Sequence, residues 1–189
     1  MKDSTPESLE EHKERIRRRM RHADDTGTGF SEIVEMMNKF NSREPKRICT
    51  YCRVGKDDQL QMVPYELLQK SYEAMISNIP DCIFTGLYVD EGLIDASPNS
   101  RKALDRMIAD CQAGRIDLIV TKSVSGLTRN IAECMFIVRD LAQLQPPVGV
   151  FFETERVLSL DKNVDLAITL IGALADQESL KKANRGGRR

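Results

Sequence analysis

Apolar positions along most of the chain follow two different periods. Four short runs are almost continuously apolar and rich in β-branched or aromatic side chains: 48–54, 83–89, 116–122 and 148–152. Runs of this kind predict strands that are buried on both faces of a sheet. The intervening segments place apolar residues three and four positions apart, which predicts helices over 64–78, 101–113 and 129–144.

The order of these segments predicts the architecture. Alternation of strands and helices indicates a parallel sheet with helices on both faces. We therefore expect an α/β fold with a mainly parallel sheet of about four strands and a long C-terminal helix. Asn99-Ser100 precedes the 101–113 segment and is a suitable N-terminal cap for it.

The terminal helix is predicted over 162–182, and its apolar surface is wider than one face. One stripe is formed by Val164, Ala167, Ile168, Ile171, Leu174 and Ala175. Leu166 and Leu170 lie off this stripe, so the helix has more apolar surface than its own sheet needs. Our preferred interpretation is a dimer partner that covers the 162–182 helix. The alternative is a helix buried deeply within a monomer.

Residues 1–46 are expected to form a helical, basic extension and a linker. Phe30, Ile33, Val34, Met37 and Phe40 recur at helical spacing, which predicts a short amphipathic helix before the linker. The predicted organisation is thus an extension over 1–46, a central domain over 47–160, the helix over 161–183 and a basic tail over 184–189.

Charge is unevenly distributed along the 189 residues, although the formal net charge is only −1. Residues 12–22 hold six Lys or Arg and one acidic residue, and residues 181–189 hold five basic residues and no acidic one. Both clusters permit contact with DNA phosphates. In the tail this would involve Lys181, Lys182, Arg185, Arg188 and Arg189. The alternative is that each cluster is a solvated helix face or tail.

The cysteines and the lack of long apolar segments favour a cytoplasmic protein. Five cysteines are an odd number without scaffold-like spacing, which favours reduced thiols. Cys49 and Cys52 form a C-x-x-C pair, but in a strand they would face opposite ways, which disfavours zinc. No transmembrane segment or signal peptide is expected.

Basic residues follow the predicted strands and begin the predicted helices. Arg53 and Lys122 stand at strand ends, and Arg101 and Arg129 open helices. Ligands of open parallel sheets bind at the carboxyl ends of the strands, and guanidinium groups suit phosphate oxygens. The pattern predicts a phosphate site among these four residues. The alternative is that they form surface ion pairs with carboxylates.

Several of these segments carry recognisable motifs. The blocks are Tyr51-Cys-Arg-Val-Gly-Lys-Asp-Asp-Gln59, Tyr88-Val-Asp-Glu-Gly92, Arg101-Lys-Ala-Leu-Asp-Arg-Met107, Ile116-Asp-Leu-Ile-Val-Thr-Lys-Ser123, Leu127-Thr-Arg-Asn130, Gly149-Val-Phe-Phe-Glu153 and Leu174-Ala-Asp-Gln-Glu-Ser179. In this order they resemble the catalytic domain of the serine recombinases (resolvases and invertases). The resemblance is closest to the large serine recombinases of mobile elements.

The resemblance implies site-specific DNA recombination without a metal or nucleotide cofactor. In the family, a serine hydroxyl attacks the scissile phosphate and forms a phosphoserine link to DNA, and an arginine cluster stabilises the transition state. The resemblance gives phosphate contacts to Arg53, Arg101 and Arg129. Supporting positions are Tyr51, Gln59, Asp90 and Lys122. It also implies dimerisation through the 162–182 helix, assembly into a tetramer, and a resolvase-like catalytic domain over 47–160.

Two positions depart from the family pattern in a way that affects the chemistry. Gly55 stands at the nucleophile position, and Gly126 stands at an arginine position. The loop from Gly92 to Ala96 also differs from the usual family sequence. We therefore expect a chain that is catalytically impaired.

Three hypotheses follow from this reading. The first is a degenerate, inactive recombinase domain that still dimerises. Its simplest version is a decaying gene copy without function. The second is a non-enzymatic DNA-binding or regulatory partner that forms a heteromer with an active recombinase. The third is a small-ligand α/β module, which no glycine-rich phosphate loop supports. No separate DNA-binding domain is expected after the basic tail.

Overall fold

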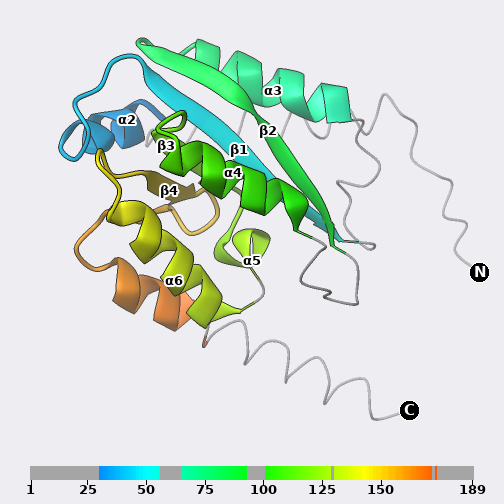
Figure 1. Cartoon of the computed structure of the whole chain (residues 1–189), viewed down its shortest axis with the longest axis vertical. Coiled ribbons are helices and arrows are strands. Elements are labelled where there is room, and N and C mark those ends of the chain that lie inside the picture. Colours follow the sequence, from blue (N-terminus) through cyan, green and yellow to red (C-terminus); the bar gives the residue numbers. More distant parts are fainter. Residues whose placement is uncertain (1–29, 56–64, 93–100, 129, 172, 174–189) are drawn as a thin grey trace, which may run out of the picture.

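A five-stranded sheet runs in the order β2-β1-β3-β4-β5 in the computed structural model, which describes residues 30–55, 65–92, 101–128, 130–171 and 173 (Figure 1). The strands are β1 (Lys46–Gly55), β2 (Cys82–Gly92), β3 (Leu118–Thr121), β4 (Gly149–Phe152) and β5 (Val157–Leu158). All neighbours pair in parallel except β5, which is antiparallel to β4. The predicted α/β class and mainly parallel sheet are confirmed, and β5 is an additional short strand.

Helices cover both faces of the sheet. One face carries α2 (Phe30–Asn38) and α3 (Tyr65–Ser77). The other carries α4 (Lys102–Gln112), α5 (Val124–Leu127) and α6 (Ile131–Ala142). The terminal helix begins at residue 164 and packs beside α6, and its predicted continuation over 174–182 lies outside the described residues. No described helix combines the length and apolar character needed to cross a membrane.

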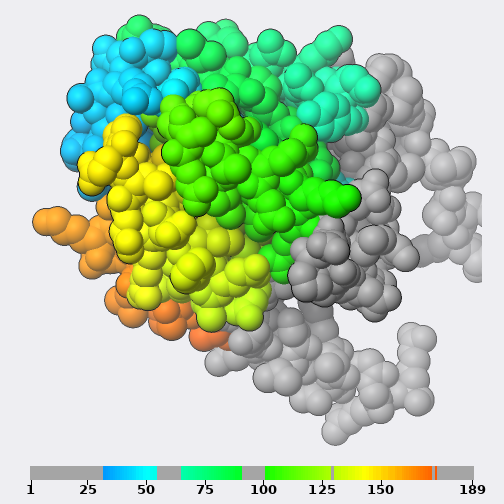
Figure 2. Space-filling model, in the orientation of Figure 1, coloured from blue at the N-terminus to red at the C-terminus, as the bar shows by residue number. Residues whose placement is uncertain are grey.

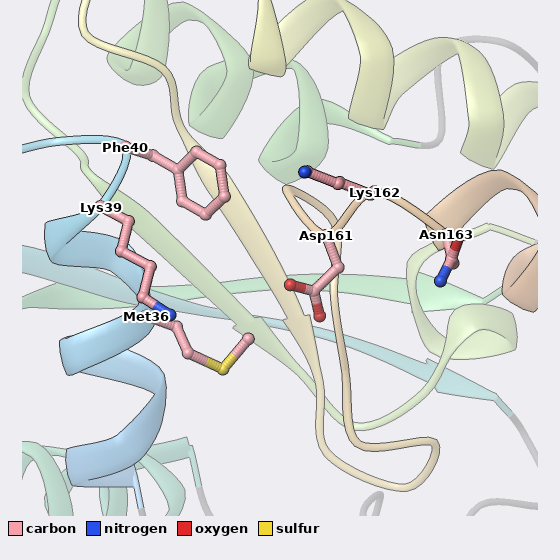
Figure 3. Close-up of a pocket in the computed structure, with 6 residues that line it drawn as sticks. All are labelled: Met36, Lys39, Phe40, Asp161, Lys162 and Asn163. Atoms are coloured by element: carbon pink, nitrogen blue, oxygen red, sulfur yellow. The ribbon is translucent and has the colours of Figure 1, made fainter.

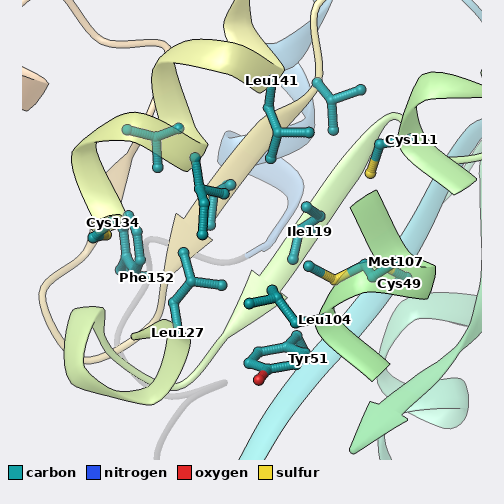
Figure 4. Close-up of a cluster of buried hydrophobic side chains, with 14 of the residues drawn as sticks. Cys49, Tyr51, Leu104, Met107, Cys111, Ile119, Leu127, Cys134, Leu141 and Phe152 are labelled. Atoms are coloured by element: carbon teal, nitrogen blue, oxygen red, sulfur yellow. The ribbon is translucent and has the colours of Figure 1, made fainter. Parts of the chain in front are cut away.

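The alternation of side chains along β1 separates two apolar clusters. Cys49 and Tyr51 pack with side chains of α4, α5 and α6 (Figure 4). Ile48 and Cys52 pack with side chains of α2 and α3 on the opposite face. The expectation that Cys49 and Cys52 face opposite ways is therefore confirmed.

Helix α2 is part of this second cluster. Ile33, Val34 and Met37 are buried against the sheet. The contact at Met37 is so close that a Cβ on Gly149 would lie 2.7 Å from the Met37 Sδ. A side chain at residue 149 would therefore require the Met37 side chain, α2 or β4 to shift.

A buried carboxylate joins the end of α2 to the amino edge of the sheet. Asp117 precedes β3 and is fully buried. It accepts hydrogen bonds from Arg47 Nε at 2.8 Å, from the Arg47 backbone N–H at 2.9 Å and from Asn41 Nδ2 at 3.0 Å. Because several donors satisfy the charge, this carboxylate fixes β1, β3 and the segment after α2 relative to one another.

Candidate active site

The carboxyl ends of β1, β2 and β3 meet at one edge of the sheet, and several of the predicted site residues that the structure describes lie there. Arg53 and Asp90 are partners in the β1–β2 ladder. Gly55 pairs with Gly92 where this ladder ends. Gly55, which the resemblance predicts to be the nucleophile position, is the last residue of β1 and lies two residues beyond Arg53.

A β-bulge determines which residue faces Arg53. The register of β1 on β2 shifts between Ile48 and Cys49. Gly86 lies at this shift with a φ of +143°, a conformation that favours glycine. Without the shift, Arg53 would lie opposite the residue before Asp90. The bulge therefore brings the arginine and the carboxylate together.

Asp90 holds the start of α4 in place. Its Oδ1 accepts the Ala103 N–H at 2.8 Å, and its Oδ2 accepts the Leu104 N–H at 2.9 Å. The Tyr51 hydroxyl donates to Oδ2 at 3.1 Å. The carboxylate satisfies free N–H groups of the helix and carries the charge that a helix N-terminus favours.

The first N–H groups of α4 are bonded by Asp90 and not by the side chain at the N-cap position. Arg101 occupies the N-cap position of α4 and makes no side-chain capping bond. The expected local cap, Asn99-Ser100, lies outside the described residues. Asp90 supplies these hydrogen bonds from β2.

The Tyr51 hydroxyl stays protonated at neutral pH. Burial is the main cause that raises the pKa of Tyr51, and the Asp90 carboxylate raises it further. The positive charges of Arg101 and Arg53 act on the hydroxyl in the opposite direction. Four of the predicted residues thus interact within one small region at the sheet edge.

Arg53 connects the end of β1 to the short helix α5. Its Nη2 donates to the backbone oxygen of Ser125 at 2.7 Å. Helix α5 is capped by Ser123, whose Oγ accepts the Gly126 N–H at 3.0 Å. Glu155 Oε1 accepts the Val124 N–H at 3.2 Å. The guanidinium is therefore supported by a firmly held backbone turn.

Arg101 is paired with an acidic residue of α6. Its Nη1 lies 2.6 Å from Glu133 Oε1, and the two side chains are 26% and 38% exposed. The hydrogen bond to Glu133 is the main cause that raises the pKa of Arg101. The partner comes from a different helix, in the first turn of α6.

Lys122 also lies near a carboxylate. Its Nζ is 3.7 Å from Glu153 Oε2, which also accepts a hydrogen bond from the Tyr72 hydroxyl at 3.4 Å. Burial raises the pKa of Glu153, and the Lys122 charge acts against this rise. The ion pairs considered as an alternative for the basic residues are therefore present at Arg101 and Lys122.

Gly126 lies within α5, close to two hydroxyl groups. A Cβ at this position would lie 3.3 Å from Ser123 Oγ and 3.4 Å from Thr121 Oγ1. Thr121 Oγ1 is buried without a hydrogen-bond partner. A Cβ can thus be accommodated at residue 126 if the Ser123 hydroxyl moves by a few tenths of an ångström.

Other predicted residues lie outside the part of the chain that the structure describes. These are Gln59, Arg129 and the basic tail residues Lys181, Lys182, Arg185, Arg188 and Arg189. Conversely, Glu133 and Glu153 contact site residues but were not predicted. Glu133 belongs to a segment whose sequence signal was a helix, Glu153 ends one of the family blocks but was given no role, and neither lies near its partner in sequence.

A surface hollow lies away from the candidate site residues. It has a volume of about 410 Å³ and is lined by Met36, Lys39, Phe40, Asp161, Lys162 and Asn163 (Figure 3). None of the candidate site residues lines it. Among the described residues, no group of three His, Cys, Asp or Glu side chains could hold a metal ion.

Comparison with known proteins identifies the family. A family model described as the N-terminal domain of resolvase matches residues 48–187. The N-terminal catalytic domain of TP901-1 integrase has a similar fold, with a TM-score of 0.50 and 19% identity over 71% of this chain and 97% of that chain. No curated protein matches the sequence.

A second solved structure has the same fold. A resolvase family site-specific recombinase from Streptococcus pneumoniae has a TM-score of 0.50 and 20% identity, over 75% of this chain and 95% of that chain. The family model covers the sheet from the third residue of β1 onward and all the described site residues. The chain therefore belongs to the resolvase N-terminal domain family, the catalytic domains of the serine recombinases.

Proposed function

We propose that this chain is a recombinase domain that keeps the phosphate-binding framework of its family but has lost DNA strand cleavage. The observation that carries the proposal is Gly55 at the end of β1, two residues beyond Arg53. Glycine has no side-chain oxygen, so a phosphoserine bond cannot form at this position.

The expected loss is large. Removal of the nucleophile from a well-characterised hydrolase lowers its rate by roughly a millionfold. Loss of one transition-state donor, as Gly126 implies, lowers a rate by roughly a hundred- to a thousandfold. Either change alone would remove useful turnover, and this chain carries both.

The framework around the missing groups supports retained binding of DNA phosphates. Asp90 and Tyr51 fix the start of α4, where Arg101 lies. Arg53 is fixed by the Ser125 carbonyl. Two guanidinium groups held at one sheet edge suit the phosphate oxygens of a DNA backbone. Such binding is independent of base sequence and weakens with salt.

The neighbouring hydroxyl groups do not replace the missing serine in this proposal. Ser123 Oγ is engaged in capping α5 through the Gly126 N–H. Ser125 Oγ lies 3.1 Å from Ser123 Oγ and is exposed. Both belong to α5 or its cap, whereas the family nucleophile lies at the end of the first strand of the domain.

The proposal is tested by a covalent-adduct assay on supercoiled plasmid that carries the DNA flanking the gene. Three proteins are compared on a denaturing gel: the native chain, Gly55→Ser, and Gly55→Ser combined with Gly126→Arg. We expect no adduct from the native chain and the strongest adduct from the double variant. An adduct from the native chain would contradict the loss of strand cleavage. The absence of an adduct from both serine variants would contradict the claim that the phosphate-binding framework is retained.

A second candidate function is a regulatory partner of an active recombinase. It is favoured by the terminal helix, where Leu166 is 62% and Leu170 is 55% exposed although Ile168 is fully buried. This exposed apolar surface suits the homodimer or heteromer predicted from the sequence. Co-purification with an active relative is the expected result. No association, together with no salt-sensitive DNA binding, would contradict this role.

A further inference from the structure

Glu133 lies where it can act on the phosphate-binding arginine of α4. Helices α4 and α6 are neighbours on the same face of the molecule (Figure 2). The Glu133 carboxylate bridges them through its 2.6 Å contact with Arg101. Glu133 is favourably placed in the first turn of α6, whereas Arg101 stands unfavourably at the N-terminus of α4. The arginine therefore benefits from an anion at this position.

We propose that Glu133 occupies the place of a DNA phosphate on Arg101 in the free protein and so sets the affinity of this site for DNA. This inference rests on the proposed function, in which Arg101 contacts phosphate. Carboxylate and phosphate oxygens present similar acceptors to a guanidinium fork. Glu133 is then a positioning residue, which holds Arg101 ready and is displaced when DNA binds.

The strength of the pair suits such an exchange. Both side chains are partly exposed, and ion pairs between solvated groups are weak. A DNA backbone with many phosphates can therefore compete for the guanidinium. After displacement the carboxylate stays close to the incoming phosphate and repels it, because like charges at short range oppose association.

The other described cations of the site are held differently. Arg53 donates to a neutral carbonyl oxygen of Ser125. Lys122 is 3.7 Å from Glu153, a longer contact to a carboxylate that is only 14% exposed. The Arg101–Glu133 contact is thus shorter than the Lys122–Glu153 contact, and the Glu133 side chain is more accessible to solvent than that of Glu153. The effect of removing one negative charge should be greatest at Glu133.

The test is DNA binding by the full chain, measured by fluorescence anisotropy with a short labelled duplex of arbitrary sequence at low and physiological salt. We expect Glu133→Gln to bind roughly two- to tenfold more tightly than the native chain. Glu133→Asp, which keeps the charge, should bind like the native chain. Glu35→Gln is the matched control, because it removes one exposed carboxylate from α2, outside the site.

Variants of Arg101 separate this inference from the proposed function. Arg101→Gln should weaken binding, and adding Glu133→Gln to it should have almost no further effect. If Arg101→Gln weakens binding but Glu133→Gln does not strengthen it, the role of Glu133 is refuted and the proposed function stands. If Arg101→Gln has no effect, or no protein binds, both are overturned. If Glu133→Gln and Glu35→Gln increase the affinity for DNA equally, the effect comes from net charge alone, and the role of Glu133 is also refuted.

Discussion

Replacement of Asp90 tests whether one carboxylate holds the candidate site together. Asp90→Ala removes both acceptors of the α4 N–H groups and the partner of the Tyr51 hydroxyl. Loss of a helix cap costs about 0.5–2 kcal/mol. A buried hydroxyl without a partner costs about 1–3 kcal/mol more. Because the two effects share one side chain, we expect the free energy of unfolding to fall by about 2–4 kcal/mol.

Urea unfolding monitored by circular dichroism measures this change, and two variants control it. Tyr51→Phe removes the hydroxyl alone and should cost about 0.5–1.5 kcal/mol. In that background Asp90→Ala should cost about 1 kcal/mol less, because no buried hydroxyl is left without a partner. Asp105→Ala removes an exposed carboxylate from the same first helical turn and should cost at most about 1 kcal/mol.

Either of two results would contradict this role of Asp90. A loss below about 0.5 kcal/mol for Asp90→Ala would show that the cap contributes little. Equal costs of Asp90→Ala in the native and Tyr51→Phe backgrounds would show that the two residues are not coupled. In the first case, Arg101 would not depend on Asp90 for its position.

Three further changes have expected outcomes. Gly149→Ala should destabilise the fold by about 1–3 kcal/mol in urea unfolding, since its Cβ would meet the Met37 sulfur, and an unchanged midpoint would contradict that contact. Asp117→Ala should lower the free energy of unfolding by about 3 kcal/mol or more, because it leaves Arg47 without its buried partner. A loss near about 1 kcal/mol would contradict the structural role of this ion pair. Burial raises the pKa of Glu153 in the folded state, so its protonation stabilises the fold at acid pH and this contribution is lost as pH rises through the raised pKa. Glu153→Gln should therefore be more stable than the native chain at neutral pH. The gain should fade as pH falls through the raised pKa of Glu153 and be absent below the ordinary glutamate value of 4.5, and a pH-independent difference would refute this assignment.

The sheet was predictable because its strands and helices have strong, uninterrupted patterns. The run over 48–54 and the helical spacing over 64–78 correspond to β1 and α3 within a few residues. The helix α5 and the strand β5 were not predicted, because four and two residues are too short to show a period. Their positions depend on contacts such as the Arg53–Ser125 bond, which link residues far apart in sequence.

The candidate site was predictable to the extent that it follows from strand order. Arg53 and Asp90 end neighbouring parallel strands, so their proximity follows from the sheet. The partners of Arg101 could not be predicted in the same way. Glu133 reaches it from another helix, and Asp90 on β2 accepts hydrogen bonds from the first turn of α4. Side-chain networks across elements are decided by packing, which a single sequence does not encode locally.

The most direct test of the central claim is to locate any covalent bond between this chain and DNA. The native chain and Gly55→Ser would each be incubated with supercoiled plasmid, digested with nuclease and protease, and mapped by mass spectrometry for a nucleotide-linked peptide. The account predicts a phosphodiester on the serine introduced at position 55 of the variant and no linked peptide from the native chain. A linked peptide from the native chain, at Ser123, Ser125 or any other residue, would contradict the claim that this domain has lost strand cleavage.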